Sequence, residues 1–157
     1  MRRKPNSRRK ARRMKVIRLW NYLDAVRALP YLRSVVNSAR DNWLDVQNRK
    51  LVVRRLTELK PTRENLIDMA EARRELDRAE SQLRDTLREL RRIHVFILDP
   101  VEGLALIPFQ RGEDLAWFVS DLFAERGIVA WRWHTDELGH RRPIEEVAGI
   151  LAMTKKA

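Results

Sequence analysis

Two of the three histidines in this 157-residue chain lie in one short stretch, AWRWHTDELGHRRP, at residues 130–143. Histidine and aspartate side chains bind zinc or iron and transfer protons in enzymes. A metal site here would use His134, Asp136 and His140. Their H-x-D-x-x-x-H spacing in a polar loop matches no recognised pattern of metal ligands. We therefore expect no metal site and no cofactor, and we interpret the stretch as the end of a strand.

The tryptophans favour this interpretation, because successive side chains of a strand point to opposite faces. Trp131 and Trp133 would share one face, whereas Arg132 and His134 would share the other. The polar residues 135–139 would then form the turn in which the chain leaves the sheet.

A second place for chemistry is the edge of the predicted sheet. An enzymatic site there would require four side chains to converge within about 10 Å of one another; these are Asp99, Glu125, His134 and Arg141. Asp99 also precedes a proline, and in such a turn-initiating pair the carboxylate accepts backbone N–H groups. The chain has no glycine-rich phosphate loop, no nucleophile elbow and no cysteine. An enzyme or metal-binding protein is therefore the less favoured hypothesis, and we expect a non-catalytic protein.

The strongest signal for binding is a basic N-terminal arm, residues 1–18. It contains ten lysines and arginines and no acid, whereas residues 19–157 contain 23 such cations against 22 acids. A block of like charges repels itself and stays disordered until an anion neutralises it. We expect the arm to bind RNA or another polyanion without sequence specificity, because phosphate contacts carry no base information. RNA is favoured over DNA because arginine-rich segments fold onto structured RNA. The predicted binding residues are Arg2, Arg3, Lys4, Arg8, Arg9, Lys10, Arg12, Arg13, Lys15 and Arg18.

Two simpler interpretations of the arm stay open. It could serve only solubility, or translation could begin at Met14 and leave most of it out. Trp20 and Tyr22 could stack on a base, although anchoring the arm to the body is their favoured role. No apolar segment follows the basic start, and no apolar run reaches the roughly 20 residues of a membrane span. A cytoplasmic protein without membrane contact is therefore expected.

Two long helices must position these residues. From about 21 to 59, apolar residues recur every three or four positions, with one break at Lys50; they are Leu29, Leu32, Val36, Ala39, Trp43, Val46 and Val53. From about 63 to 92, apolar or small residues fill every a and d position of a heptad pattern; they are Met69, Ala72, Leu76, Ala79, Leu83, Thr86 and Leu90. Pro30 is expected to start the first helix or to kink it.

After residue 92 the apolar period changes from helical spacing to strand alternation, which predicts an antiparallel sheet of three or four strands. The expected strands are 93–98, 103–109, 115–119 and 128–133. The fold class is therefore α+β, a long antiparallel helical hairpin (21–92) followed by a β-meander (93–134). Both belong to one domain over 19–150, and residues 151–157 form a tail. The hairpin is expected to pack on the sheet and to bury Trp117, Phe118, Trp131 and Trp133.

The hairpin is longer than so small a sheet can cover. Its distal half is expected to expose apolar surface near Val46, Val53, Leu66 and Met69, and patches of that kind mark interfaces. A homodimer, or a docking site for another protein, is the scaffold function that we weigh against polyanion binding.

Several short motifs follow one another along residues 20–144. Ala25, Leu29 and Pro30 place an alanine four residues before a Leu-Pro pair at the opening of the first helix, and the stretch 99–108 reads DPVEGLALIP. Three further motifs follow: Ala124-Glu125, Trp133-His134 and Arg141-Arg142-Pro143-Ile144. In this order they resemble a prokaryotic family known as domain of unknown function 2203, whose clearest motif is D-P-x-x-G-L-V-D-F-P. The resemblance implies a bacterial type of protein and lends no activity.

The chain departs from the family pattern at several positions. Leu106 stands where the motif has its second aspartate, and Ser120-Asp121 occupies the place of a Cys-Trp pair. Trp133-His134 fits the family's Trp-His pair only with a two-residue gap, whereas Trp131-Arg132 fits it without one. Both His134 and Arg132 therefore remain candidates for that position.

Overall fold

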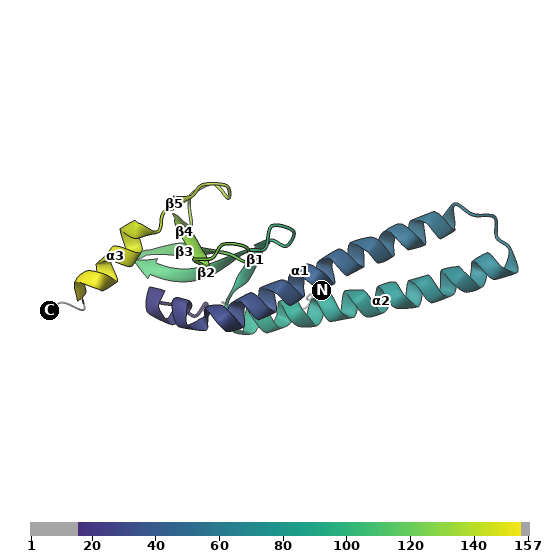
Figure 1. The fold of residues 1–157 in the computed structure, drawn as a ribbon, viewed down its shortest axis with the longest axis horizontal. Coiled ribbons are helices and arrows are strands. Elements are labelled where there is room, and N and C mark those ends of the chain that lie inside the picture. Colours follow the sequence, from purple (N-terminus) through teal and green to yellow (C-terminus); the bar gives the residue numbers. More distant parts are fainter. Residues whose placement is uncertain (1–15, 155–157) are drawn as a thin grey trace, which may run out of the picture.

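The computed structural model describes residues 16–154, with side chains up to residue 149. Two long helices, α1 (Tyr22–Thr57) and α2 (Arg63–Arg92), form an antiparallel hairpin that is followed by a five-stranded antiparallel sheet (Figure 1). The α+β fold predicted from the sequence is confirmed. All predicted binding residues of the arm except Arg18 lie outside the described residues, as do residues 155–157 of the predicted tail.

Capping hydrogen bonds between residues close in sequence determine where the two long helices begin. Asn21 caps α1 by accepting the backbone N–H of Asp24 at 2.8 Å, and Thr62 caps α2 by accepting that of Asn65 at 3.2 Å. Helix α1 begins at Tyr22 and continues through the exposed Pro30, so the proline does not start the helix. Its missing N–H leaves only one helical hydrogen bond unmade.

The two predicted stripes face each other along the hairpin seam. Val46 is buried with Ala72 and Ala79, whose small side chains let the helices approach closely. Apolar surface was expected to be exposed near Val46; Val46 itself is buried in the hairpin, whereas Leu66 is exposed. The ion pair between Arg49 and Glu75 also crosses the seam.

The sheet follows the chain order without a crossover. Its strands are β1 (Phe96–Asp99), β2 (Leu104–Arg111), β3 (Asp114–Asp121), β4 (Ile128–Trp133) and β5 (Arg142–Pro143). The fifth strand was not predicted, because an arginine followed by a proline has no apolar alternation. A last helix, α3 (Glu145–Thr154), follows it. None of the helices in the described part of the chain is long and apolar enough to cross a membrane.

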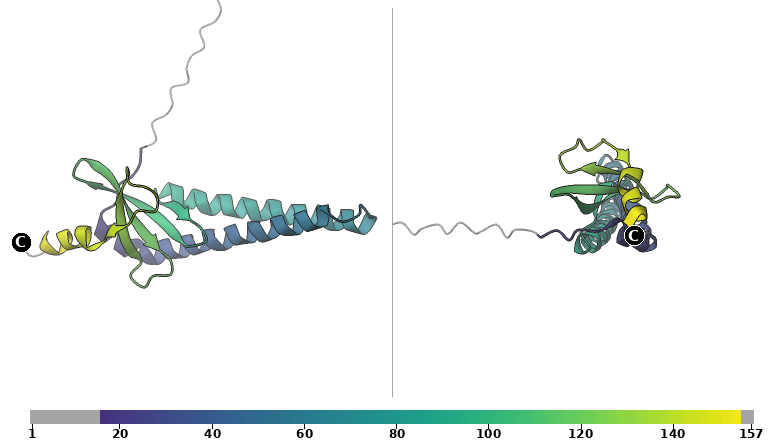
Figure 2. Two further views of the ribbon diagram at one scale, coloured as in Figure 1. Left: turned by 90° about the horizontal axis from the view of Figure 1, so that it is seen from above. Right: turned by 90° about the vertical axis from the view of Figure 1, so that its left-hand side faces the viewer.

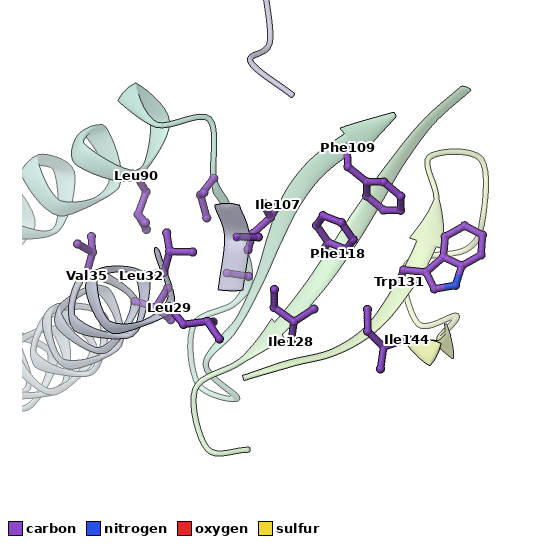
Figure 3. Close-up of a cluster of buried hydrophobic side chains, with 14 of the residues drawn as sticks. Leu29, Leu32, Val35, Leu90, Ile107, Phe109, Phe118, Ile128, Trp131 and Ile144 are labelled. Atoms are coloured by element: carbon purple, nitrogen blue, oxygen red, sulfur yellow. The ribbon is translucent and has the colours of Figure 1, made fainter. Parts of the chain in front are cut away.

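The inner face of the sheet packs on the proximal part of the hairpin, and the rest of the hairpin projects beyond the sheet (Figures 1 and 2). The rings of Phe109 and Phe118 stack there at 3.9 Å between centroids. One buried cluster joins these strands to both helices (Figure 3), and its members include Leu29, Leu32, Leu90, Ile107, Phe118, Ile128, Trp131 and Ile144. Trp133 is partly buried against this cluster.

Trp117 does not pack on the hairpin, so that expectation is wrong. It follows Ala116 and precedes Phe118, both of the inner cluster, and strand alternation therefore turns it to the outer face. There it joins a second buried cluster with Leu106, Val119 and Ala130 that contains no helical residue.

Strand β1 pairs with only the first half of β2, and Trp20 contacts the same edge of β2 beyond the end of that pairing. The backbone N–H of Trp20 donates to the carbonyl of Pro108 at 2.7 Å, and Trp20 forms a parallel bridge with Phe109. Proline lacks an N–H and is usually confined to edge strands. Pro108 is tolerated within the sheet because the side of β2 that lacks its N–H is the side that β1 leaves uncovered.

Two glycines with left-handed backbones give a matched test of the packing between sheet and hairpin. Gly127 has φ +78°, and an added Cβ would lie 2.8 Å from Cδ1 of Leu29; Gly112 has φ +64° and open space around it. We expect Gly112→Ala to cost about 1 kcal/mol of unfolding free energy through backbone strain. Gly127→Ala should cost about 1–3 kcal/mol more, because the methyl group overpacks a filled core. Urea titrations measure both, and equal losses would show that Leu29 moves aside freely.

Candidate nucleic-acid interface

The arm joins the body at Trp20, which is fixed by its backbone and its ring. Besides the backbone bond to β2, the indole N–H of Trp20 donates to the carbonyl of Ile93 at 3.1 Å. The guanidinium of Arg18 lies 5.5 Å from the Trp20 ring centroid, within the range of a cation–π interaction. These contacts support the anchoring role expected for Trp20.

A shallow hollow of about 210 Å³ opens beside this anchor. Trp20 and Tyr22 line it from the start of the hairpin, and Phe109, Gln110 and Arg111 line it from the end of β2. Arg18 and Arg111 therefore bring positive charge to a surface of aromatic rings. Such a combination suits the bases and phosphates of a single strand, because bases stack on rings while cations contact the backbone.

Arg111 links the hollow to the tryptophans of β4. Its guanidinium lies 4.4 Å from the Trp131 ring centroid and 5.6 Å from that of Trp133. The two tryptophan rings meet edge to face at 4.9 Å, which confirms that they share one face of the strand. The indole N–H of Trp131 donates to Glu146 at 3.1 Å and so holds its ring in place. Arg111 was not predicted from the sequence, because no local pattern shows that the end of β2 lies near β4.

The polar residues of the stretch 130–143 are engaged in local structure. His134 Nδ1 accepts the indole N–H of Trp117 at 3.1 Å, on the outer face of the sheet. Arg132 is buried on that face, where its guanidinium donates to the carbonyl of Asp136. His140 is exposed in the loop. Within residues 16–154, no cluster of three histidines and acids has the arrangement of a metal site.

The four residues of the candidate enzymatic site lie at two opposite ends of the sheet. Asp99 ends β1 and Glu125 lies in the turn after β3, both at the end where Leu104 pairs with Asp121, whereas His134 and Arg141 flank the loop at the other end. The seven residue steps of β2 separate these ends by about 23 Å. The four side chains therefore cannot act on one reacting centre.

Each of these residues has a structural contact instead. The carboxylate of Asp99 accepts the backbone N–H groups of Val101 and Glu102 at 3.0 and 3.1 Å. The backbone carbonyl of Glu125 accepts from Arg33 at 2.7 Å, and Arg141 donates to two carbonyls of its own loop. These contacts stabilise turns, and they do not bring the four side chains together around one site.

Asp136 organises the loop between β4 and β5. Its two carboxylate oxygens accept from Arg142 at 2.8 and 2.9 Å, and one also accepts the backbone N–H of Trp133 at 2.9 Å. The bonds from Arg142 lower the pKa of Asp136 well below its usual range; the Trp133 N–H adds to this shift and partial burial opposes it. The ionised carboxylate thus ties β5 to the end of β4.

This pair predicts a specific dependence of stability on pH. Because the folded-state pKa of Asp136 is depressed, its contribution is full above the unfolded carboxyl pKa of about 4 and is lost as the pH falls through the folded value. Asp136→Asn should therefore lower the melting temperature at neutral pH, and the difference from the native chain should shrink below about pH 4. Glu137→Gln removes the same charge from an exposed neighbour and serves as the control. A difference that stays constant down to about pH 2 would contradict the assigned ion pair.

Comparison with known protein families places residues 18–144 in a family described as uncharacterized conserved protein (DUF2203). No curated protein and no solved structure matches the chain significantly. The matched span begins at Arg18 and ends at Ile144, so it takes in the hairpin and all five strands. It confirms the resemblance stated from the sequence and covers most of the chain. The chain belongs to the DUF2203 family.

Proposed function

We propose that this protein binds RNA through the phosphate groups of the nucleic acid, with the basic arm as the principal contact. The observation that carries the proposal is the segregation of charge along the chain. Residues 16–154 contain 22 lysines and arginines and 22 acids, so their formal net charge is zero. Residues 1–15 contain nine cations and no acid. The structured body is neutral and the segment joined to it is strongly cationic. We therefore assign polyanion binding to that segment rather than to the folded body.

The surface at the arm's exit supports the same proposal. Arg18, Trp20 and Arg111 lie together where the arm joins the body. Arg91 and Arg92 end α2 directly before Ile93, whose carbonyl accepts from the Trp20 ring. An RNA strand held by the arm would therefore continue onto further cations and a partly exposed indole. Stacking of a base on such a ring is tolerant of sequence.

The proposed mode of binding is electrostatic and non-catalytic. Each neutralised phosphate releases counterions, so affinity falls steeply with salt and carries no base preference. Arginine-rich segments gain order on structured RNA, which favours RNA over duplex DNA. A cytoplasmic site of action, without a membrane partner, belongs to this proposal.

A four-arginine variant tests the arm. Replacing Arg8, Arg9, Arg12 and Arg13 with glutamine should lower the affinity for a fluorescent RNA hairpin at least about tenfold at low salt. The slope of log K against log salt should decrease in magnitude by about 3, at 0.7–0.9 for each lost contact. Fluorescence anisotropy over a salt series measures both. The melting temperature should not change, because the structured body is intact.

The matched control removes four exposed arginines from α2: Arg73, Arg74, Arg78 and Arg84. Net charge falls equally in both variants, so only the arm variant should lose the salt slope. Equal losses in the two variants would assign binding to overall charge. Undiminished RNA affinity without residues 1–15 would rule out the arm, and tighter binding of duplex DNA would replace RNA with DNA.

A second candidate function is interaction with a protein through the hairpin. The specific observation in its favour is the group of exposed apolar side chains near the loop between α1 and α2, of which Leu66 is 58% exposed and Ile67 is 57% exposed. A solvated helix face rarely exposes several large apolar residues together.

A further inference from the structure

The hairpin tip, defined as residues 50–67, combines apolar and cationic groups that no described part of the chain covers. Five large apolar side chains there are 43–58% exposed: Leu51, Val52, Leu59, Leu66 and Ile67. The tip lies beyond the sheet, where only the two helices face each other (Figures 1 and 2). Its five cations outnumber its two acids, Glu58 and Glu64. Among the described residues, none of these cations forms an ion pair: Lys50, Arg54, Arg55, Lys60 and Arg63.

Acidic and apolar groups lie together at a second surface, the turn pair, which is defined as the two turns 100–103 and 122–127. The turns touch, since a Cβ on Gly103 would lie 2.7 Å from Cβ of Leu122. Val101 and Phe123 are 42% and 64% exposed. Four acids lie in or beside these turns: Asp99, Glu102, Asp121 and Glu125. The single cation of the turns, Arg126, is paired with Glu145.

One row of α1 side chains runs from the turn pair to the tip. Arg33 donates to the backbone of the second turn, and Arg40 donates to the carbonyl of Val101 at 3.1 Å while covering the Phe123 ring. At about 100° per residue, four later residues fall within about 40° of the same line along the helix; these are Leu44, Gln47, Leu51 and Arg55. The side of α1 that carries the turn pair therefore also carries part of the tip.

We propose that two copies of the chain form an antiparallel dimer in which the hairpin tip of each copy lies against the turn pair of the other. Basic and apolar groups of the tip then meet acidic and apolar groups of the turns, and charge complementarity of this kind fixes the partner and the register. A twofold axis makes both contacts identical and closes the assembly.

The α1 row sets the register of this dimer. A twofold axis between Gln47 and Asn48 brings Leu44 of each copy level with Leu51 of the other. The same axis brings Arg55 level with Arg40, whose guanidinium is already occupied by the first turn. Arg54 and Arg55 can then reach the acids of the turn pair. A second copy supplies the layer that the sheet is too short to provide.

Cysteine crosslinking tests the register directly, because the native chain has no cysteine. Leu44→Cys combined with Leu51→Cys should give a covalent dimer on mild oxidation. Within one chain these positions are about 10.5 Å apart along the helix, beyond the roughly 7 Å that a disulfide spans. Each single variant should stay uncrosslinked, as should the off-register control with Asn37→Cys and Leu51→Cys. A covalent dimer of Leu66→Cys alone would show tip-to-tip association and overturn the proposal.

A charge swap tests the chemistry. The native chain should have twice its mass of 18.7 kDa by light scattering and should dissociate on dilution. Arg54→Glu with Arg55→Glu, or Glu102→Arg with Glu125→Arg, should each raise the dimer dissociation constant at least about tenfold. Combining both pairs should restore dimerisation. Glu113→Arg with Asp114→Arg, at the other end of the sheet, should leave it unchanged.

The dimer proposal can be tested independently of RNA binding. The samples are nuclease-treated protein and protein lacking residues 1–15. The dimer should persist in both, because no contact of the proposed interface involves the arm. A monomer at all concentrations up to about 100 µM would overturn the dimer. The tip would instead be an RNA surface if reversing Arg54 and Arg55 weakened RNA binding without changing the mass.

Discussion

The contact between the inner face of the sheet and the proximal half of the hairpin is the interaction on which the rest of the structure depends. Leu32 of α1 and Leu90 of α2 meet Ile107 of the sheet in one buried cluster, and burial of apolar surface is the main force that stabilises a fold of this size. The sheet has strands of at most eight residues, whereas α1 is about 54 Å long. The sheet therefore covers one part of the hairpin and leaves the rest uncovered. This difference determines which apolar residues stay accessible.

Most of the helical architecture could be predicted from the sequence, because many apolar residues of a long helix recur at the same spacing and each supports the same assignment. The heptad positions of α2 are such a case, and Ala72, Ala79, Thr86 and Leu90 are all buried. Strand β5 carries no such redundancy, since two residues define no period. The error at Trp117 had another cause. Strand alternation places it on the face opposite Phe118, so the two neighbouring residues could not both pack on the hairpin.

The candidate interface was less predictable than the fold, because its contacts join segments far apart in sequence. Trp20 meets Ile93 and Pro108, and Arg111 stacks on Trp131, only after the sheet has formed. Composition identified the charge of the arm, which needs no fold. By contrast, the separation of Asp99 and Glu125 from His134 and Arg141 depends on strand order. Because of this strand order, the four polar residues form two separate groups of turn contacts instead of one site.

The bridge between Trp20 and β2 has a consequence for how the protein behaves when it is shortened or cleaved. Strand edges with unpaired backbone groups pair readily with other chains and so begin aggregation. Because β1 stops halfway along β2, the remaining edge would be open if Trp20 did not lie on it. The residue that attaches the arm thus also closes the sheet. A cut after Trp20 would therefore open a strand edge to self-association.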